Sequence, residues 1–79
     1  MMEEIKGEIV FRHIGNIPQT GEINGMIVLK TENDEDMTLR INPNTKYESL
    51  EEGSIVTVTY EQDADHEHLM ATEITPDSN

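Results

Sequence analysis

The chain has 79 residues, enough for one small domain and too few for a second core. It has no cysteine, which excludes disulfides, thiolate metal sites and a cysteine nucleophile. Seventeen acidic residues against five basic ones give a net charge of −12, which disfavours sequence-independent binding to nucleic acid and to anionic membranes. A basic protein partner, divalent cations, or solubility alone is compatible with this charge.

The first strand is expected over residues 5–14, where β-branched residues alternate with period two. Gly7 is unusual inside a strand. It predicts a bulge or a sharp bend through which one strand serves two sides of a barrel, or simply a flexible start. The apolar face of this strand is predicted to carry Ile5, Gly7, Ile9 and Phe11.

Residues 15–25 contain three glycines and a proline, and they predict a long exposed connection with a tight turn at Asn24 and Gly25. Two strands follow, over residues 26–31 and 37–41, joined by the acidic hairpin turn ENDED. In the strand expected over residues 26–31 nearly every side chain is apolar, so either both faces of this strand are covered or one face is an exposed apolar strip. The second strand is predicted to direct Met37, Leu39 and Ile41 inward.

One short helical turn is predicted within residues 42–53, between the third and fourth strands. Pro43 ends the preceding strand, and Thr45 followed by Glu48 has capping-box spacing. A fourth strand is expected over residues 55–60, with Val56, Val58 and Tyr60 on one face, and a fifth over residues 69–75.

This order of elements, with a glycine in the first strand, resembles an OB-fold, a five-stranded, partly open barrel. The second half of the chain also resembles small OB-like domains of unknown function found in bacterial proteins. The resemblance implies an all-β domain over residues 1–79 with an ordered core of about 5–76, and it implies little about function. It is carried by Thr45, Leu50, Gly53, Val56, Val58, Ala71 and Ile74.

The densest group of candidate metal ligands lies at residues 61–68. If His66 and His68 lie on a strand, their side chains share one face. With a carboxylate from Asp63 or Glu61 they could hold zinc, nickel or copper. The alternative is a solvated acidic hairpin tip. The acidic turn 33–36 lacks the spacing of an EF-hand and is interpreted as a turn.

Catalysis has few candidate groups. Ser49 and Ser54 do not lie in a strained Gly-x-Ser-x-Gly turn, and His13 has no identifiable partner. The sequence therefore predicts a protein that is not an enzyme and has no cofactor.

Single-stranded nucleic acid is an alternative ligand, because OB barrels bind it on the face of the second and third strands. The basic and polar residues expected there are Arg12, Lys30, Thr38 and Arg40. Against this alternative, Phe11 is predicted to face inward and the loop at residues 61–68 is acidic.

The leading prediction is a non-catalytic binding module for a protein partner, possible through open strand edges or the apolar strip at residues 26–29. The partner could also be a second copy of the chain. No segment of the given sequence resembles a signal peptide or a membrane span, so a cytoplasmic location is the default expectation.

Overall fold

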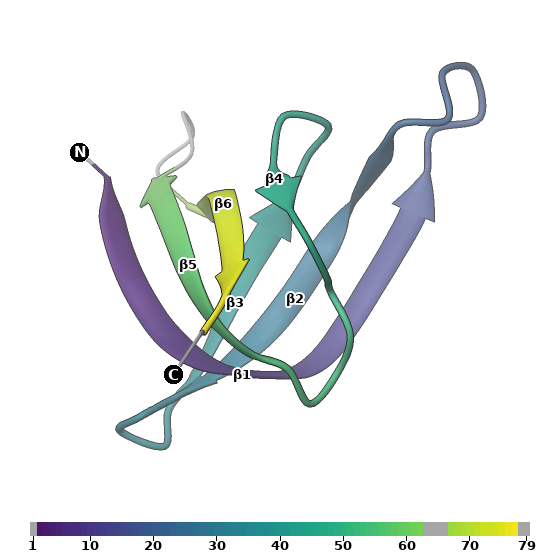
Figure 1. Ribbon diagram of the computed structural model, residues 1–79. Coiled ribbons are helices and arrows are strands. Elements are labelled where there is room, and N and C mark those ends of the chain that lie inside the picture. Colours follow the sequence, from purple (N-terminus) through teal and green to yellow (C-terminus); the bar gives the residue numbers. More distant parts are fainter. Residues whose placement is uncertain (1, 63–66, 78–79) are drawn as a thin grey trace.

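The computed structural model describes residues 2–62 and 67–77, which contain strands and no helix. The predicted all-β class is therefore confirmed (Figure 1). The strands are β1 (Glu3–Asn16), β2 (Ile23–Thr31), β3 (Asp36–Ile41), β4 (Lys46–Tyr47), β5 (Ile55–Gln62) and β6 (Leu69–Pro76).

The strands form one sheet in the order β3-β2-β1-β5-β6-β4, and an additional pairing of β3 with β6 closes it. This closure uses one register position, at which Arg40 lies opposite Met70 in parallel orientation. The five-stranded barrel is thus present, and it is closed rather than partly open. The extra strand β4 adds two residues to the edge of β6.

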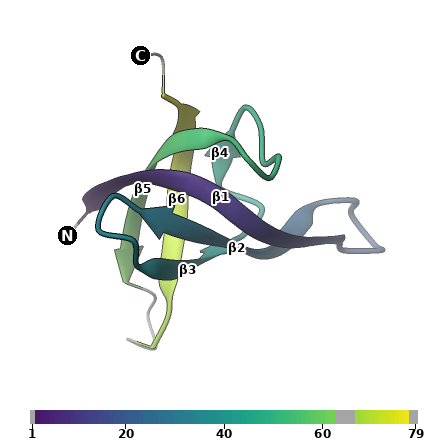
Figure 2. The same ribbon diagram turned by 90° about the horizontal axis from the view of Figure 1, so that it is seen from below.

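Strand β1 is shared between two partners. Glu3–Glu8 pair with β5, Gly7–Asn16 pair with β2, and Gly7 lies in both ladders. A Cβ at Gly7 would collide with the carbonyl oxygen of Lys30 and come within 2.9 Å of Leu29 Cγ. The absence of a side chain therefore lets β1 bend tightly across β2, which is one of the two alternatives that the sequence left open; Figures 1 and 2 show the curvature.

A β-bulge interrupts the same strand three residues later. Ile9 lies opposite Leu29 and Phe11 lies opposite Val28, so Val10 is an extra residue. The bulge reverses which face each following side chain occupies. Ile9 is fully buried, whereas Phe11 is 49% exposed. The prediction that Phe11 faces inward is wrong for this reason.

The barrel core comes from all five main strands and from Leu50 in the connection after β4. In β2 only Ile27 and Leu29 are fully buried, while Met26 and Val28 are half-buried on the opposite face. The apolar strip at residues 26–29 is thus divided between the core and the outside. The core residues are Ile9, Ile27, Leu29, Leu39, Ile41, Leu50, Val56, Val58, Ala71 and Ile74.

The β1–β2 hairpin is longer than predicted and projects from the barrel as an arm, defined here as residues 13–26 (Figure 1). Its loop is only residues 17–22 and turns at Gly21, whose φ is 75°. Gly25 lies inside β2, not in a turn, and a Cβ there would collide with the His13 carbonyl. The long exposed connection and the Asn24–Gly25 turn were therefore wrong.

Residues 42–53 hold β4 and turns instead of the expected helical turn. Thr45 does not cap a helix. Its buried hydroxyl donates to the Ala71 carbonyl at 2.7 Å and accepts from Asn42 N–H at 3.0 Å. The hydroxyl thereby fastens the connection to β6, which explains why a polar residue is buried here.

Substitution of Gly7 tests the close crossing of β1 and β2. We expect Gly7→Ala to lower the free energy of unfolding by about 1–3 kcal/mol, because backbone atoms must move to admit the methyl group. Gly15→Ala is the matched control, since the nearest atom to its added Cβ is 3.9 Å away. Denaturant unfolding of both variants measures the difference, and equal stabilities would contradict the close crossing.

Candidate functional site

The four residues proposed for nucleic-acid contact do not form one cluster. Thr38 and Arg40 are exposed on β3 and face outward, opposite to buried Leu39. Arg12 lies opposite Ile27, on the inward side, and its Nη1 donates to the Leu50 carbonyl at 3.4 Å. The bulge at Val10 is what separates Arg12 from the other three.

Lys30 also faces outward, but acidic residues of the β2–β3 hairpin neutralise it. Its Nζ lies 3.1 Å from Asp36 Oδ1 and 3.7 Å from Asp34 Oδ1. The hydrogen bond and the charge of Asp36 raise the pKa of Lys30 above its ordinary value. Two carboxylates thus already contact the Lys30 ammonium, which leaves it poorly suited to bind a phosphate.

The outward surface of β1, β2 and β3, called the outer face below, has an apolar centre. Cross-strand register sets its rows: Phe11 lies beside Val28, which lies beside Thr38. In the next row His13 lies opposite Met26, Met26 lies opposite Arg40, and Arg40 lies opposite Met70 of β6. The outer face comprises Phe11, Val28 and Thr38 with His13, Met26, Arg40 and Met70.

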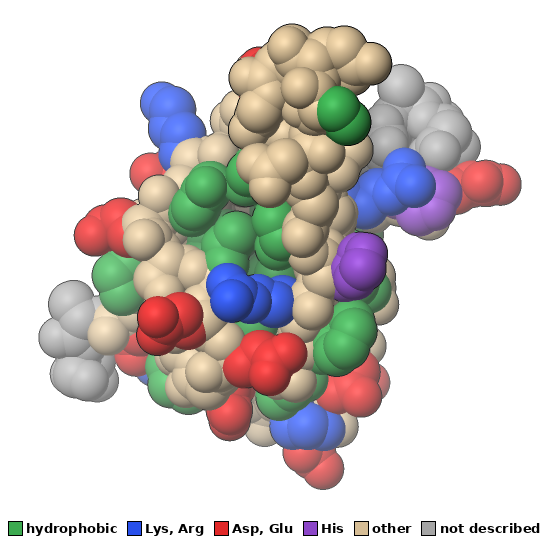
Figure 3. Space-filling view, turned by 90° about the vertical axis from the view of Figure 1, so that its right-hand side faces the viewer, with side chains coloured by type: hydrophobic (Ala, Val, Ile, Leu, Met, Phe, Trp, Pro, Cys, Tyr) green, Lys and Arg blue, Asp and Glu red, His purple; other side chains and the backbone are tan. Residues whose placement is uncertain are grey.

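Acidic side chains are nearly absent from residues 9–31, which supply β2 and the second part of β1 to this face. Residues 9–31 contain Glu22 as their single acid, with Arg12 and Lys30 as bases. This acid-poor stretch thus carries +1 of the net charge of −12, and the remaining residues carry −13. Figure 3 looks at the side of the molecule that bears the arm, and acidic side chains gather on the body beside and below it.

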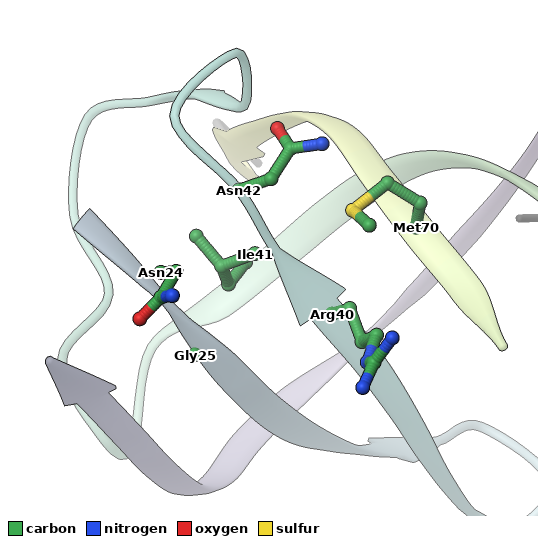
Figure 4. A pocket seen from close by; sticks show the side chains of 6 residues that line it. All are labelled: Asn24, Gly25, Arg40, Ile41, Asn42 and Met70. Carbon is green, nitrogen blue, oxygen red and sulfur yellow. The ribbon is translucent and has the colours of Figure 1, made fainter. Parts of the chain in front are cut away.

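A hollow of about 370 Å³ lies at the end of β3 (Figure 4). The side chains of Asn24 and Asn42 point away from each other, on opposite sides of β3, and the Met70 thioether lies between β6 and β3. The polar groups do not converge on one point as a small-ligand site requires. The hollow is lined by Asn24, Gly25, Arg40, Ile41, Asn42 and Met70.

A second hollow, of about 270 Å³, lies where β1 bends. Its two cations are already paired, Lys30 with Asp36 and Lys6 with Asp77, the latter at 3.1 Å. The hydrogen bond to Asp77 raises the pKa of Lys6. This pairing fastens the end of the described chain to β1, so the hollow does not offer an open anion site.

The predicted metal site falls mostly outside the described residues, because Asp63 and His66 are not among them. His68 directly precedes β6 and is half-buried. Residues 2–62 and 67–77 contain no group of three or more His, Cys, Asp or Glu side chains arranged to hold a metal ion. The metal prediction at residues 61–68 thus stays a prediction.

The residues considered for catalysis have local structural roles. The Ser49 hydroxyl accepts a hydrogen bond from Glu51 N–H at 3.2 Å, and the Ser54 carbonyl accepts one from Ile9 N–H at 2.9 Å. His13 is exposed on the outer face, opposite Met26. No helix in the described part of the chain is long and apolar enough to cross a bilayer.

Comparison with known proteins identifies a fold and no family. No protein-family model matches the chain, and no curated protein matches it. Among solved structures, the chain is similar to CusF in its silver(I) complex, with a TM-score of 0.61 and 18% sequence identity over 98% of this chain and 99% of that one. At this identity the likeness shows the small OB-like β-barrel alone. The narrower resemblance to bacterial domains of unknown function stays a prediction.

Phe11 is the functional candidate that the sequence reasoning missed. The only sign in the sequence was the succession of three apolar residues, Ile9, Val10 and Phe11, where alternation requires a polar one. Such a break is compatible with a bulge, but it does not say which residue is the extra one.

Proposed function

We propose that this chain is a non-catalytic binding module that holds a protein partner on its outer face. The observation that carries this proposal is the outward-facing pair of Phe11 and Val28, flanked by Met26, in the acid-poor part of the chain. Other exposed apolar side chains, such as Tyr47 and Ile55, lie on β4 and β5, outside this patch.

The composition of the outer face suits a protein interface. Aromatic residues anchor such interfaces, and charged residues are depleted at their centres and found at their rims. Here Val28 lies on the middle strand with Phe11 beside it, while Arg40 and His13 lie in the neighbouring row. Covering the exposed half of Phe11 contributes about 1 kcal/mol, so contacts to the neighbouring apolar side chains must add to the affinity.

Photocrosslinking tests the proposed face directly. We expect a photoreactive benzoylphenylalanine in place of Phe11 to label a discrete protein in lysate from the source organism, and the same group in place of Tyr47 to label none. Both positions are exposed to a similar degree, 49% and 44%. Excess native chain should compete for the labelling and Phe11→Ser chain should not. Equal labelling from the two positions, or none from either, would refute the proposal.

Single-stranded nucleic acid is a second candidate, and the outward position of Phe11 favours it because bases stack on exposed aromatic rings. Thr38 lies in the same row as Phe11, two strands away across β2, and Arg40 lies on the same strand in the next row. The position of Arg12 on the opposite face of the sheet, the pairing of Lys30 and the charge of −12 oppose it.

A salt titration separates the two ligand classes. We expect no saturable binding of labelled single-stranded oligonucleotides at low salt, where phosphate contacts are strongest. Binding that weakens as salt rises, and that is lost in both Phe11→Ser and Arg40→Ala, would support nucleic acid over protein. Fluorescence anisotropy measures it, with Lys46→Ala as a control for nonspecific charge effects, since Lys46 lies on β4.

Metal binding is a further candidate because the similar structure is a silver(I) complex. Thioether and imidazole groups suit soft ions, and Met26 and His13 lie directly opposite each other. This candidate requires silver(I) to raise the melting temperature and Met26→Leu to abolish the shift.

The metal site predicted at residues 61–68 has a parallel test. It requires zinc or nickel to raise the melting temperature, and it requires the double variant His66→Ala, His68→Ala to abolish that rise. Unchanged melting temperatures with all these ions would eliminate both sites.

A further inference from the structure

The second edge of β1 is covered along only part of its length. β5 pairs with it up to Glu8, and residues 53–54 bond both backbone groups of Ile9, at 2.9 and 2.7 Å. The carboxylate of Glu52 then accepts from Arg12 N–H at 3.3 Å. From His13 to Asn16, no strand of the described chain pairs with this edge.

The backbone groups at this edge alternate in direction. Arg12 N–H points to Glu52, away from β2, whereas the His13 carbonyl lies against Gly25 of β2. Successive residues of a strand direct their N–H and C=O groups to opposite edges. Ile14 therefore presents one donor and one acceptor at the open edge of the arm. An open edge of this kind is a template for another strand.

We propose that the strand added there is β1 of a second copy of this chain, in antiparallel orientation around a two-fold axis at Ile14. Such an arrangement is self-complementary, because each Ile14 donates to and accepts from the other. The proposal uses the edge of the sheet and not the outer face, so it is independent of the proposed function.

Electrostatic repulsion between the two anionic chains favours contact through their arms. The arm contains one acid, Glu22, and no base, so it contributes −1, whereas the rest of each chain contributes −11. Contact through any other surface brings two strongly anionic bodies together, whereas the arm projects from the barrel (Figure 1). Glu22 is the one acid that each arm brings to the contact. Arm-to-arm contact thus minimises the repulsion between copies.

The paired arms would join two three-stranded faces into a continuous sheet in the order β3-β2-β1-β1-β2-β3. A two-fold axis perpendicular to the sheet puts both outer faces on the same side. The dimer therefore places two Phe11 patches on one side, and together with the proposed function this arrangement raises the avidity for a partner that contacts both patches. The shared edge is four residues long, so the dimer is weak and its population depends on concentration.

Sedimentation velocity at increasing protein concentration tests the association. We expect the mean mass to rise from 9.0 kDa toward twice that value. We also expect the dissociation constant to fall about tenfold between about 0.02 and 0.5 M salt, because salt screens the repulsion of the two bodies. A chain that stays monomeric at all concentrations and salts would overturn the proposal. Open-ended polymers would also overturn it, since they indicate an arm docking on an acidic body.

Variants at Ile14 locate the contact. Ile14→Pro removes the edge N–H while leaving the β1–β2 ladder intact, as proline on an open edge does, and we expect it to stay monomeric. Ile14→Val should dimerise like the native chain. Because the chain has no cysteine, Ile14→Cys should form a disulfide-linked dimer on mild oxidation, faster than Tyr47→Cys. Equal oxidation rates, or dimerisation of folded Ile14→Pro, would refute the contact, whereas photocrosslinking from position 11 would be unaffected.

Discussion

The structure depends on one strand serving two partners. β1 pairs with β5 through its first half and with β2 through its second, with Gly7 in both ladders. Two local features make this possible: a glycine whose missing side chain permits close contact with Lys30, and an extra residue at Val10. A bulge bends and twists a strand, which a small barrel of five strands requires to close.

The bulge also determines which side chains of β1 lie on the outer face. Because it reverses the alternation of β1, Phe11 lies on the outer face beside Val28, and Arg12 lies on the opposite face of the sheet, exposed, with its guanidinium near the Leu50 carbonyl. The same residue thus creates an apolar outer face and removes one of the cations that would have favoured nucleic acid. It also directs the backbone of Ile14 toward the open edge of the arm. The proposals for the outer face and for the edge both follow from this reversal.

Much of the barrel could be predicted from the sequence. Strict alternation in β3 and β5 identified Leu39, Val56 and Val58 as core residues, and all three are fully or almost fully buried. Asp34 adopts the left-handed angle, φ of 63°, that an Asp- and Asn-rich turn permits. These predictions succeeded because they rest on period-two patterns and turn chemistry, which are local.

The errors came from interactions that are not local. The capping-box spacing of Thr45 and Glu48 predicted a helical turn, but the Thr45 hydroxyl bonds to Ala71, 26 residues away. Gly25 looked like a turn residue, and it is instead required by close packing against His13. The low number of acids in residues 9–31 is visible in the sequence, but only the structure shows that these residues form neighbouring strands and the projecting arm.

Residue-by-residue hydrogen exchange of the amides in β1 tests the reversal at Val10 most directly, at low protein concentration and low salt so that the chain is monomeric. The account predicts that the amides of Ile9 and His13 are protected while that of Ile14 exchanges rapidly. A strand without the bulge would protect Ile14 and expose His13. That opposite pattern would contradict the outward position of Phe11 and everything inferred from it.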